Sequence, residues 1–362
     1  MKPQYPFGNN PDKIERYKAF WNRDDVDRPL VGFSFVGWYP LEYFTACKPW
    51  KVDDHITPGM LNPAEWLDDY EVLLREGETV DDDMIRGACP IQVAFPCFLP
   101  AMLGCEIRVL PDNVMGIEQK LPWEQALQKG LDREDPWYLK YMDFADALVR
   151  RADGRYPVSH GVELGPTDLH ALLRGHNESL VDLLDEPEKS AELLMNMGHL
   201  FAAVFSSVWE RIPLWQDGYF DAQYQLWAPG PIVRLQEDAT AVFSPDLYRK
   251  LVQPVDRMVA EQFDCSFIHL HTTSMFILDA FLEIEALRCF EINIESFNIP
   301  VKEMIPYFKM VQGADRSLLI RGSLSEDEMR LVVDSLDPRG LYLHIMPESK
   351  EEVDRLRPIL GM

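Results

Sequence analysis

Two histidines separated by one residue, His269 and His271, end the apolar run that begins at Phe267. In an extended strand, residues i and i+2 point to the same face, so both imidazoles would project together. If the strand belongs to a (β/α)8 barrel, the pair lies at the carboxyl ends of the strands, where barrel enzymes carry out their chemistry. The spacing therefore predicts a metal or acid–base site. The alternative is a pair of core histidines that hydrogen-bond to a neighbouring strand.

Charged side chains at the ends of other apolar runs are the candidates for catalysis. Glu163 ends one such run, Glu291 and Glu295 alternate along another, and Arg321 ends a third. Because buried carboxylates are costly unless paired, we expect Glu291 and Glu295 to face a partner or a substrate. Arg321 is the best candidate to pair with them or with a substrate carboxylate. Glu163 is expected to act as a general base, a ligand or an orienting group, with turn capping as the structural alternative.

Aromatic residues and one cysteine complete the predicted substrate site. Trp38, Tyr39, Tyr224 and Trp227 would make the mouth of a barrel aromatic, which suits a flat or apolar substrate. Packing inside the barrel is the alternative role for these rings. Cys97 is a candidate nucleophile or soft ligand, and a buried thiol is the alternative.

Short apolar runs alternate with amphipathic helical patterns along the whole chain. This alternation predicts an α/β fold, and eight runs are the number needed for a closed (β/α)8 TIM barrel. An open doubly wound sheet is the alternative, but no GxGxxG turn supports it. The eight predicted strands are Leu30–Val36, Ile91–Phe95, Val158–Glu163, Phe220–Leu226, Phe267–His271, Phe290–Ile294, Leu318–Arg321 and Leu341–Ile345.

The chain is predicted to form a single domain over residues 1–362, with one large insertion. More than 50 residues separate the first two runs, so residues 39–90 are expected to form a lid on the barrel mouth. The acidic run Asp81–Asp83 within it is expected to be a solvated loop, with cation binding as the alternative. Capping signals predict where some helices begin, for example the box at Ser325–Glu328.

Composition excludes several classes of partner. The net charge of −25 and the pI of about 4.6 argue against nucleic acid and against an anionic membrane surface. We find no signal peptide at the N-terminus and no apolar stretch that approaches the length of a membrane span. The six cysteines have no CxxC spacing and are expected to be reduced thiols of a cytoplasmic protein. A small-molecule substrate is expected, and a homodimer is compatible with the sequence.

Five local patterns occur in one order along the chain and together resemble the uroporphyrinogen decarboxylase superfamily. This superfamily includes porphyrinogen decarboxylases and cobalamin-dependent methyltransferases, and the resemblance implies a barrel fold. The patterns are Arg28–Val31 with Gly37–Tyr43; Gly165–Asp168 with Leu172, Leu173 and Gly175; Glu237–Asp238 with Phe243–Pro245, Tyr248 and Pro254; His269–His271; and Leu343–Pro347 with Ser349 and Glu352.

Three departures from the decarboxylase pattern exclude a porphyrinogen as the expected substrate. Ser34 and Trp38 stand where the decarboxylases have two arginines that grip the substrate carboxylates, and Cys97 stands where they have an aspartate. Each lost charge-assisted contact costs on the order of 1.5–3 kcal/mol. The resemblance therefore implies the methyltransferase branch.

That branch holds zinc with a His-x-Cys pair and a later cysteine. His269 and His271 match the pair, and His344 falls at about the later position, so the resemblance implies a three-histidine zinc site. It also implies a corrinoid on a separate protein, or a pterin, as the methyl carrier. Two alternatives remain. One is a decarboxylase (a lyase) acting on a smaller acid, with Arg321 binding the carboxylate. The other is a non-catalytic barrel that binds a small molecule or a corrinoid partner.

Overall fold

A six-stranded parallel sheet forms the centre of the protein. The computed structural model describes residues 5–35, 43–91, 95–111, 113–294 and 299–362. The strand order is β1-β11-β10-β9-β8-β7, and every neighbouring pair is parallel. The fold is therefore α/β with a parallel central sheet. Its strands are β1 (Leu30–Phe33), β7 (Ile232–Gln236), β8 (Cys265–His271), β9 (Leu287–Asn293), β10 (Ser317–Gly322) and β11 (Leu341–Ile345).

Two small antiparallel sheets lie outside the central sheet. One joins β2 (His55–Ile56), β3 (Ile107–Val109) and β4 (Val114–Gly116). The other joins β5 (Tyr219–Asp221) and β6 (Leu226–Ala228).

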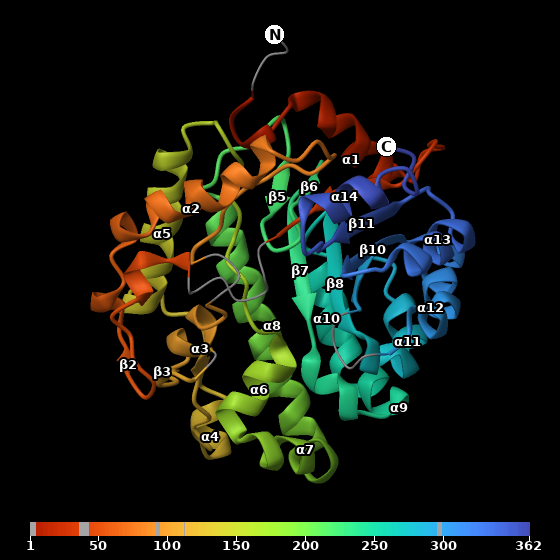
Figure 1. Cartoon of the computed structure of the whole chain (residues 1–362). Coiled ribbons are helices and arrows are strands. Elements are labelled where there is room, and N and C mark those ends of the chain that lie inside the picture. Colours follow the sequence, from red (N-terminus) through yellow and green to blue (C-terminus); the bar gives the residue numbers. More distant parts are fainter. Residues whose placement is uncertain (1–4, 36–42, 92–94, 112, 295–298) are drawn as a thin grey trace.

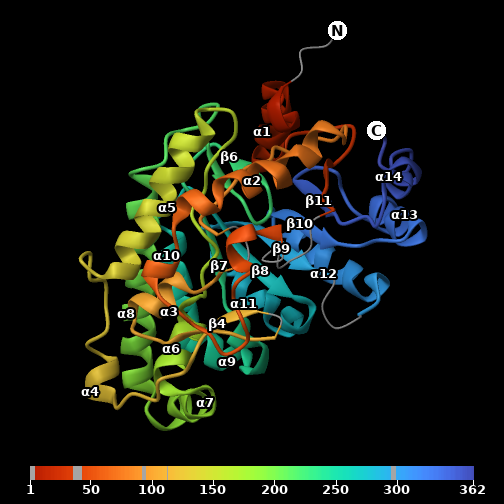
Figure 2. The same ribbon diagram turned by 60° about the vertical axis from the view of Figure 1, so that its left-hand side comes forward.

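Helices surround the central sheet, with α5 and α8 on one side and α12 and α13 on the other (Figures 1 and 2). The capping box predicted at Ser325 and Glu328 is present at the start of α13. The helices are α1 (Ile14–Asn22), α2 (Leu67–Leu74), α3 (Phe98–Met102), α4 (Trp123–Ala126), α5 (Pro136–Ala152), α6 (Pro166–Arg174), α7 (His176–Asp185), α8 (Pro187–Trp209), α9 (Pro245–Leu247), α10 (Gln253–Ala260), α11 (Leu278–Leu282), α12 (Val301–Gly313), α13 (Glu326–Ser335) and α14 (Lys350–Leu356).

Helix α8 differs from one sequence expectation, because its length and composition would allow it to cross a membrane. In the fold, 61% of its most apolar window is buried, and the helix packs against α6 and α10. The apolar residues of α8 therefore contribute to the protein core.

The two faces of the central sheet contact different parts of the core. Side chains alternate along each strand, and one set packs in the large cluster that also contains residues of α5, α8, α10 and α12. This set includes Val31, Ile268, Phe290, Ile320 and Leu343. The other set, which includes Leu30, Phe267, Cys289, Leu319 and Tyr342, packs in a second cluster. Near the carboxyl ends of the strands this second face becomes polar. It carries the side chains of His269, His271, Glu291, Arg321 and His344.

The predicted strand Phe220–Leu226 is wrong. The structure places its two ends in β5 and β6, which pair with each other and not with the central sheet. Gln225 has a left-handed φ of 52°, and Asp221 accepts a hydrogen bond from the backbone N–H of Tyr224, so the chain turns back here. The strand of the central sheet that was not predicted is β7, in which Arg234 interrupts the apolar run.

The predicted strand Ile91–Phe95 falls largely on residues 92–94, outside the described residues, and Ile91 itself lies in a turn with a φ of 49°. An earlier segment lies beside β1 instead. The N–H of Asp83 donates to the carbonyl of Val31, and farther along the segment Ala88 forms a parallel bridge with Val158. Residues 83–88, near the end of the predicted lid, therefore contact β1 at one end and Val158 at the other, outside the strands of the central sheet.

Two residues of the acidic run Asp81–Asp83 are not solvated, whereas the side chain of Asp81 is exposed. Asp82 and Asp83 are buried and accept hydrogen bonds from the N–H groups of Phe33 and Val31. Arg86 pairs with Asp82, and Arg28 pairs with Asp83. These carboxylates therefore attach residues 82–83 to β1.

Candidate metal centre

Three side chains place donor atoms within 4.8 Å of one another: Asp238, His269 and His271. The two histidines lie at the end of β8, and Asp238 follows the end of β7, the neighbouring strand. The Nε2 atoms of the histidines are 3.3 Å apart, and Nε2 of His271 is 3.7 Å from Oδ1 of Asp238. The cluster thus forms where two adjacent parallel strands end.

The spacing of these donors fits a small divalent cation. Two nitrogens that bind zinc at about 2.0–2.1 Å in a tetrahedron lie about 3.3–3.4 Å apart, which matches the observed separation of the two Nε2 atoms. The Asp238 oxygen is slightly farther from His271 than such a tetrahedron requires. Two histidines and one carboxylate are a known catalytic zinc set that leaves a fourth position open.

The other ring nitrogen of His269, Nδ1, contacts two side chains on the side away from His271. Nδ1 makes a very short contact with Oε2 of Glu291, and the hydroxyl of Tyr224 lies 2.8 Å from the same nitrogen. A carboxylate only accepts hydrogen bonds, so this contact places the proton on Nδ1 and leaves the lone pair of His269 on Nε2, towards His271. Carboxylates commonly orient metal-binding histidines in this way.

His271 is suited to be a ligand because its surroundings favour the neutral ring. Burial lowers the pKa of His271 below its ordinary value, and the neighbouring His269 lowers it further, against the opposing effect of Asp238 and Glu291. A lowered pKa favours the neutral imidazole, which is the form that binds metals. The side chain is 27% exposed, so the cluster remains accessible.

His344, the third histidine of the predicted zinc site, lies outside this donor cluster. It is on β11, which β9 and β10 separate from β8. Its ring stacks on Tyr342. Burial holds the pKa of His344 well below its ordinary value, and Arg321 and Arg86 lower it further. The structure therefore assembles two of the three predicted histidines and adds Asp238.

In the sequence, Asp238 stands out only within the family pattern, because the strand before it, β7, was not predicted. Once β7 is recognised, Arg234, Gln236 and Asp238 share the alternation that placed the two histidines together on β8. The pattern that could have identified Asp238 is therefore the series of polar residues at every second position near the end of β7.

The predicted catalytic residues Glu163 and Arg321 lie in different surroundings. Glu163 is buried and accepts a hydrogen bond from the N–H of Leu99. Burial raises the pKa of Glu163 well above its ordinary value, which favours the protonated carboxyl group. Arg321 is in register with His344 on the polar face, and its guanidinium lies 5.9 Å from the ring centre of Tyr224. Tyr224 thus links Arg321 to the cluster through His269.

The remaining predicted site residues divide into two groups. Trp227 is buried, donates to the carbonyl of Trp215 and packs in the second core cluster. Cys97 is buried where α3 begins, and its thiol donates to the carbonyl of Val114. Burial raises the pKa of Cys97 well above its ordinary value, which does not favour a nucleophilic thiolate. Trp38, Tyr39 and Glu295 lie outside the described residues.

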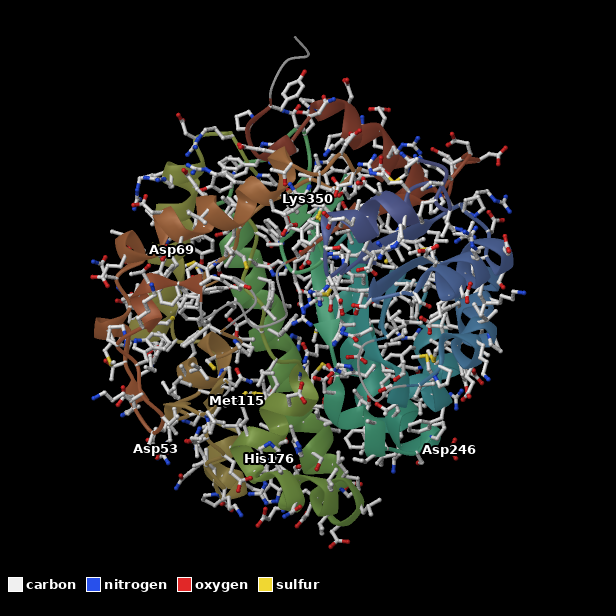
Figure 3. All side chains as sticks on the ribbon, in the orientation of Figure 1. Asp53, Asp69, Met115, His176, Asp246 and Lys350 are labelled. Atoms are coloured by element: carbon white, nitrogen blue, oxygen red, sulfur yellow. The ribbon has the colours of Figure 1, made fainter. Side chains whose placement is uncertain are left out.

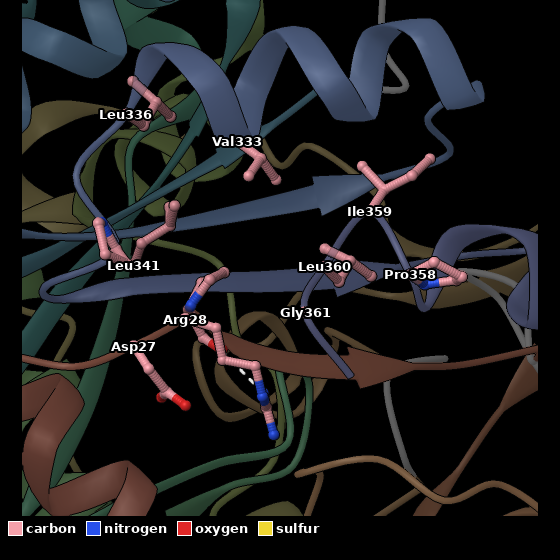
Figure 4. Close-up of a pocket in the computed structure, with 11 residues that line it drawn as sticks. Asp27, Arg28, Val333, Leu336, Leu341, Pro358, Ile359, Leu360 and Gly361 are labelled. Carbon is pink, nitrogen blue, oxygen red and sulfur yellow. Dashed lines mark hydrogen bonds between the residues drawn. The ribbon is translucent and has the colours of Figure 1, made fainter.

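The cavity shown in Figure 4 is remote from this cluster. Its volume is about 330 Å³, and its lining includes Arg28, Val333, Leu336 and Leu341. Leu341 is the first residue of β11, so the cavity lies at the amino ends of the strands. Arg28 is already paired with Asp83. This cavity therefore belongs to the opposite end of the sheet from the histidines.

Comparison with known proteins identifies a shared fold. The structure of a methyltransferase from Methanosarcina mazei superposes on this one with a TM-score of 0.61, over 96% of this chain and 98% of that chain. The two sequences are 15% identical, so the match establishes the fold alone. No family model and no curated protein sequence matches the chain.

Proposed function

We propose that this protein is a methyltransferase in which Asp238, His269 and His271 hold a zinc ion at the carboxyl end of a (β/α)8 barrel. The observation that carries the proposal is the 3.3 Å separation of the two Nε2 atoms beside a carboxylate, with Glu291 behind one ring. The fold shared with a methyltransferase agrees with it.

Contacts at the two edges of the sheet support a closed barrel. Residues 83–88 lie beside β1, and Ala88 forms a parallel bridge with Val158. Farther along, the guanidinium of Arg234 on β7 donates to the carbonyl of Glu163. These contacts connect β1 to β7 through two short segments. A barrel closed in this way would place the cluster at its mouth, the usual position of a barrel active site.

The residues around the cluster suggest a division of roles. A bound zinc ion would supply Lewis acidity that stabilises a negative charge developing on a substrate oxygen or thiol. Glu291 and Tyr224 would keep the lone pair of His269 directed at the ion. With nitrogen and oxygen donors and no thiolate, the set favours an oxygen-containing substrate over a soft thiol. Arg321 would bind an anionic group of that substrate on the same face.

The proposed identity of the methyl carrier is based on the sequence resemblance. A corrinoid on a separate protein, or a pterin, would exchange a methyl group with the small-molecule substrate at the mouth. A decarboxylase acting on a small acid is the second candidate, and it is favoured by the position of Arg321 beside His344 on the polar face.

The test combines metal content with turnover. Protein purified without added metal is expected to contain about one zinc per chain by elemental analysis, and Asp238→Ala and His269→Ala are expected to lose it. The zinc-loaded protein should then demethylate free methylcobalamin in the presence of small alcohols or thiols. The change in corrin absorbance measures this reaction. A chain that holds no zinc, or that binds zinc equally well without Asp238 and His269, contradicts the proposal.

A further inference from the structure

Gln236, the last residue of β7, links the candidate metal centre to a buried arginine. We infer that Gln236 is the positioning residue for Asp238: its amide holds one carboxylate oxygen so that the other faces His271. The inference rests on the proposed zinc site and extends it, because it identifies what orients the carboxylate ligand.

The side chains of Arg234, Gln236 and Asp238 form a continuous row of hydrogen bonds. A guanidinium N–H of Arg234 donates to Oε1 of Gln236 at 2.5 Å, and Nε2 of Gln236 donates to Oδ2 of Asp238 at 2.5 Å. The remaining oxygen of Asp238, Oδ1, is the one 3.7 Å from His271 Nε2. One carboxylate oxygen is thus occupied by the amide while the other faces the histidines.

The chemistry of the row requires a central group that both accepts and donates hydrogen bonds. A guanidinium can only donate hydrogen bonds and a carboxylate can only accept them, so the group between them must accept on one side and donate on the other. Glutamine meets both requirements while adding no charge. A glutamate at this position would place a second negative carboxylate beside that of Asp238, and the two would repel each other. A methionine has a similar length but would form no strong hydrogen bond with Arg234 or with Asp238.

Arg234, at the end of the row away from Asp238, and the backbone of β7 are also fixed by contacts. Arg234 is 1% exposed, and its second guanidinium nitrogen donates to the carbonyl of Glu163. Gln236 is the register partner of His269 across β7 and β8. A Cβ atom on Gly165 would lie 1.5 Å from the carbonyl oxygen of Gln236, so the neighbouring loop packs directly on this strand end. These contacts fix the amide relative to both histidines.

A double-mutant cycle on Co²⁺ affinity tests the inference, with cobalt alone as the probe and the full chain throughout. Loss of a group that orients a metal ligand typically weakens metal binding about 10- to 100-fold, and this is the effect expected for Gln236→Met. Asp238→Ala keeps both histidines, so its weaker Co²⁺ affinity is measured by titration to higher cobalt concentrations. In this background Gln236→Met should change Co²⁺ affinity by less than about 2-fold, because the ligand that Gln236 positions is absent. Equal effects of Gln236→Met in both backgrounds would mean a general structural role and would overturn the inference.

Gln312→Met is the matched control. The Gln312 amide also bonds on both sides, donating to the carbonyl of Asp337 and accepting from its N–H, but it lies on α12. Its replacement should leave Co²⁺ affinity unchanged. If Asp238→Ala weakens binding and Gln236→Met does not, the inference fails and the zinc site stands. If Asp238→Ala binds Co²⁺ as tightly as the wild type, the zinc site and the inference both fail.

Discussion

His269 and Glu291 are register partners on the adjacent strands β8 and β9, and the Glu291 carboxylate contacts Nδ1 of the His269 ring. Both side chains are buried, with exposures of 4% and 0%. Parallel pairing directs partner side chains to the same face, so the sheet itself brings the carboxylate to the ring. The contact determines which nitrogen of His269 is available to a metal.

Replacement of Glu291 by glutamine should therefore weaken zinc binding while preserving the shape of the side chain. We expect zinc affinity to fall about 10- to 100-fold, because the neutral amide supports the His269 ring less strongly than the carboxylate does. Competition with a chromophoric chelator measures the affinity. Glu303→Gln, at an exposed position of α12, is the control. Unchanged affinity in Glu291→Gln would show that the carboxylate does not support the ligand.

Replacement of His271 by alanine should remove the metal and leave the fold intact. The side chain is 27% exposed at a strand end, so the free energy of unfolding of the metal-free protein should change by no more than about 1 kcal/mol. Zinc content and thermal unfolding of the chelator-treated variant measure the two effects. His176→Ala is the control, because this histidine is exposed on α7, as Figure 3 shows. Full zinc content in His271→Ala would refute its role as a ligand.

Uroporphyrinogen should not be a useful substrate. Ser34 cannot supply the charge of an arginine, and the buried Cys97 thiol bonds to a backbone carbonyl, so it offers no carboxylate to pyrrole N–H groups. Decarboxylation should remain far below the rate of about 1 per second that is common for enzymes. Product analysis by chromatography is the measurement. Turnover at an enzymatic rate would contradict the assignment to the methyltransferase branch.

The buried carboxyl group of Asp256 should make the protein less stable as the pH rises. Burial raises the pKa of Asp256 from 3.8 to about 7, although Tyr248 donates a hydrogen bond to it. Between these values the unfolded chain releases a proton that the folded chain retains, so stability falls as the pH rises from about 4 through about 7. Asp256→Asn should therefore raise the melting temperature at pH 8, and the difference should shrink towards pH 4.

Thermal unfolding across this pH range is the measurement, with Asp246→Asn as the control. Asp246 is an exposed residue on α9, and its replacement should leave the pH dependence unchanged (Figure 3). An increase in the melting temperature of Asp256→Asn that is the same at pH 4 and pH 8 would contradict the argument.

Local patterns in the sequence were sufficient at several single strands and helices, although they failed at Phe220–Leu226 and at β7. The spacing of His269 and His271 alone placed both rings on one face of β8, because side chains alternate along a strand. The strands β1, β8, β9, β10 and β11 were recognised because each is a short apolar run between helical patterns. The capping residues of α13 identified its start without reference to the rest of the fold.

The tertiary structure decided which residues from different strands meet. His344 has the same local signal as His271, an imidazole near a strand end, but β9 and β10 lie between their strands. Asp238 lies close to the two histidines because β7 pairs directly with β8. The sequence could not indicate that pairing, because Arg234 interrupts the apolar run of β7 and the strand was not predicted. Residue alternation is a property of one strand, whereas a metal centre needs donors from neighbouring strands, and only the order and register of the sheet specify those neighbours.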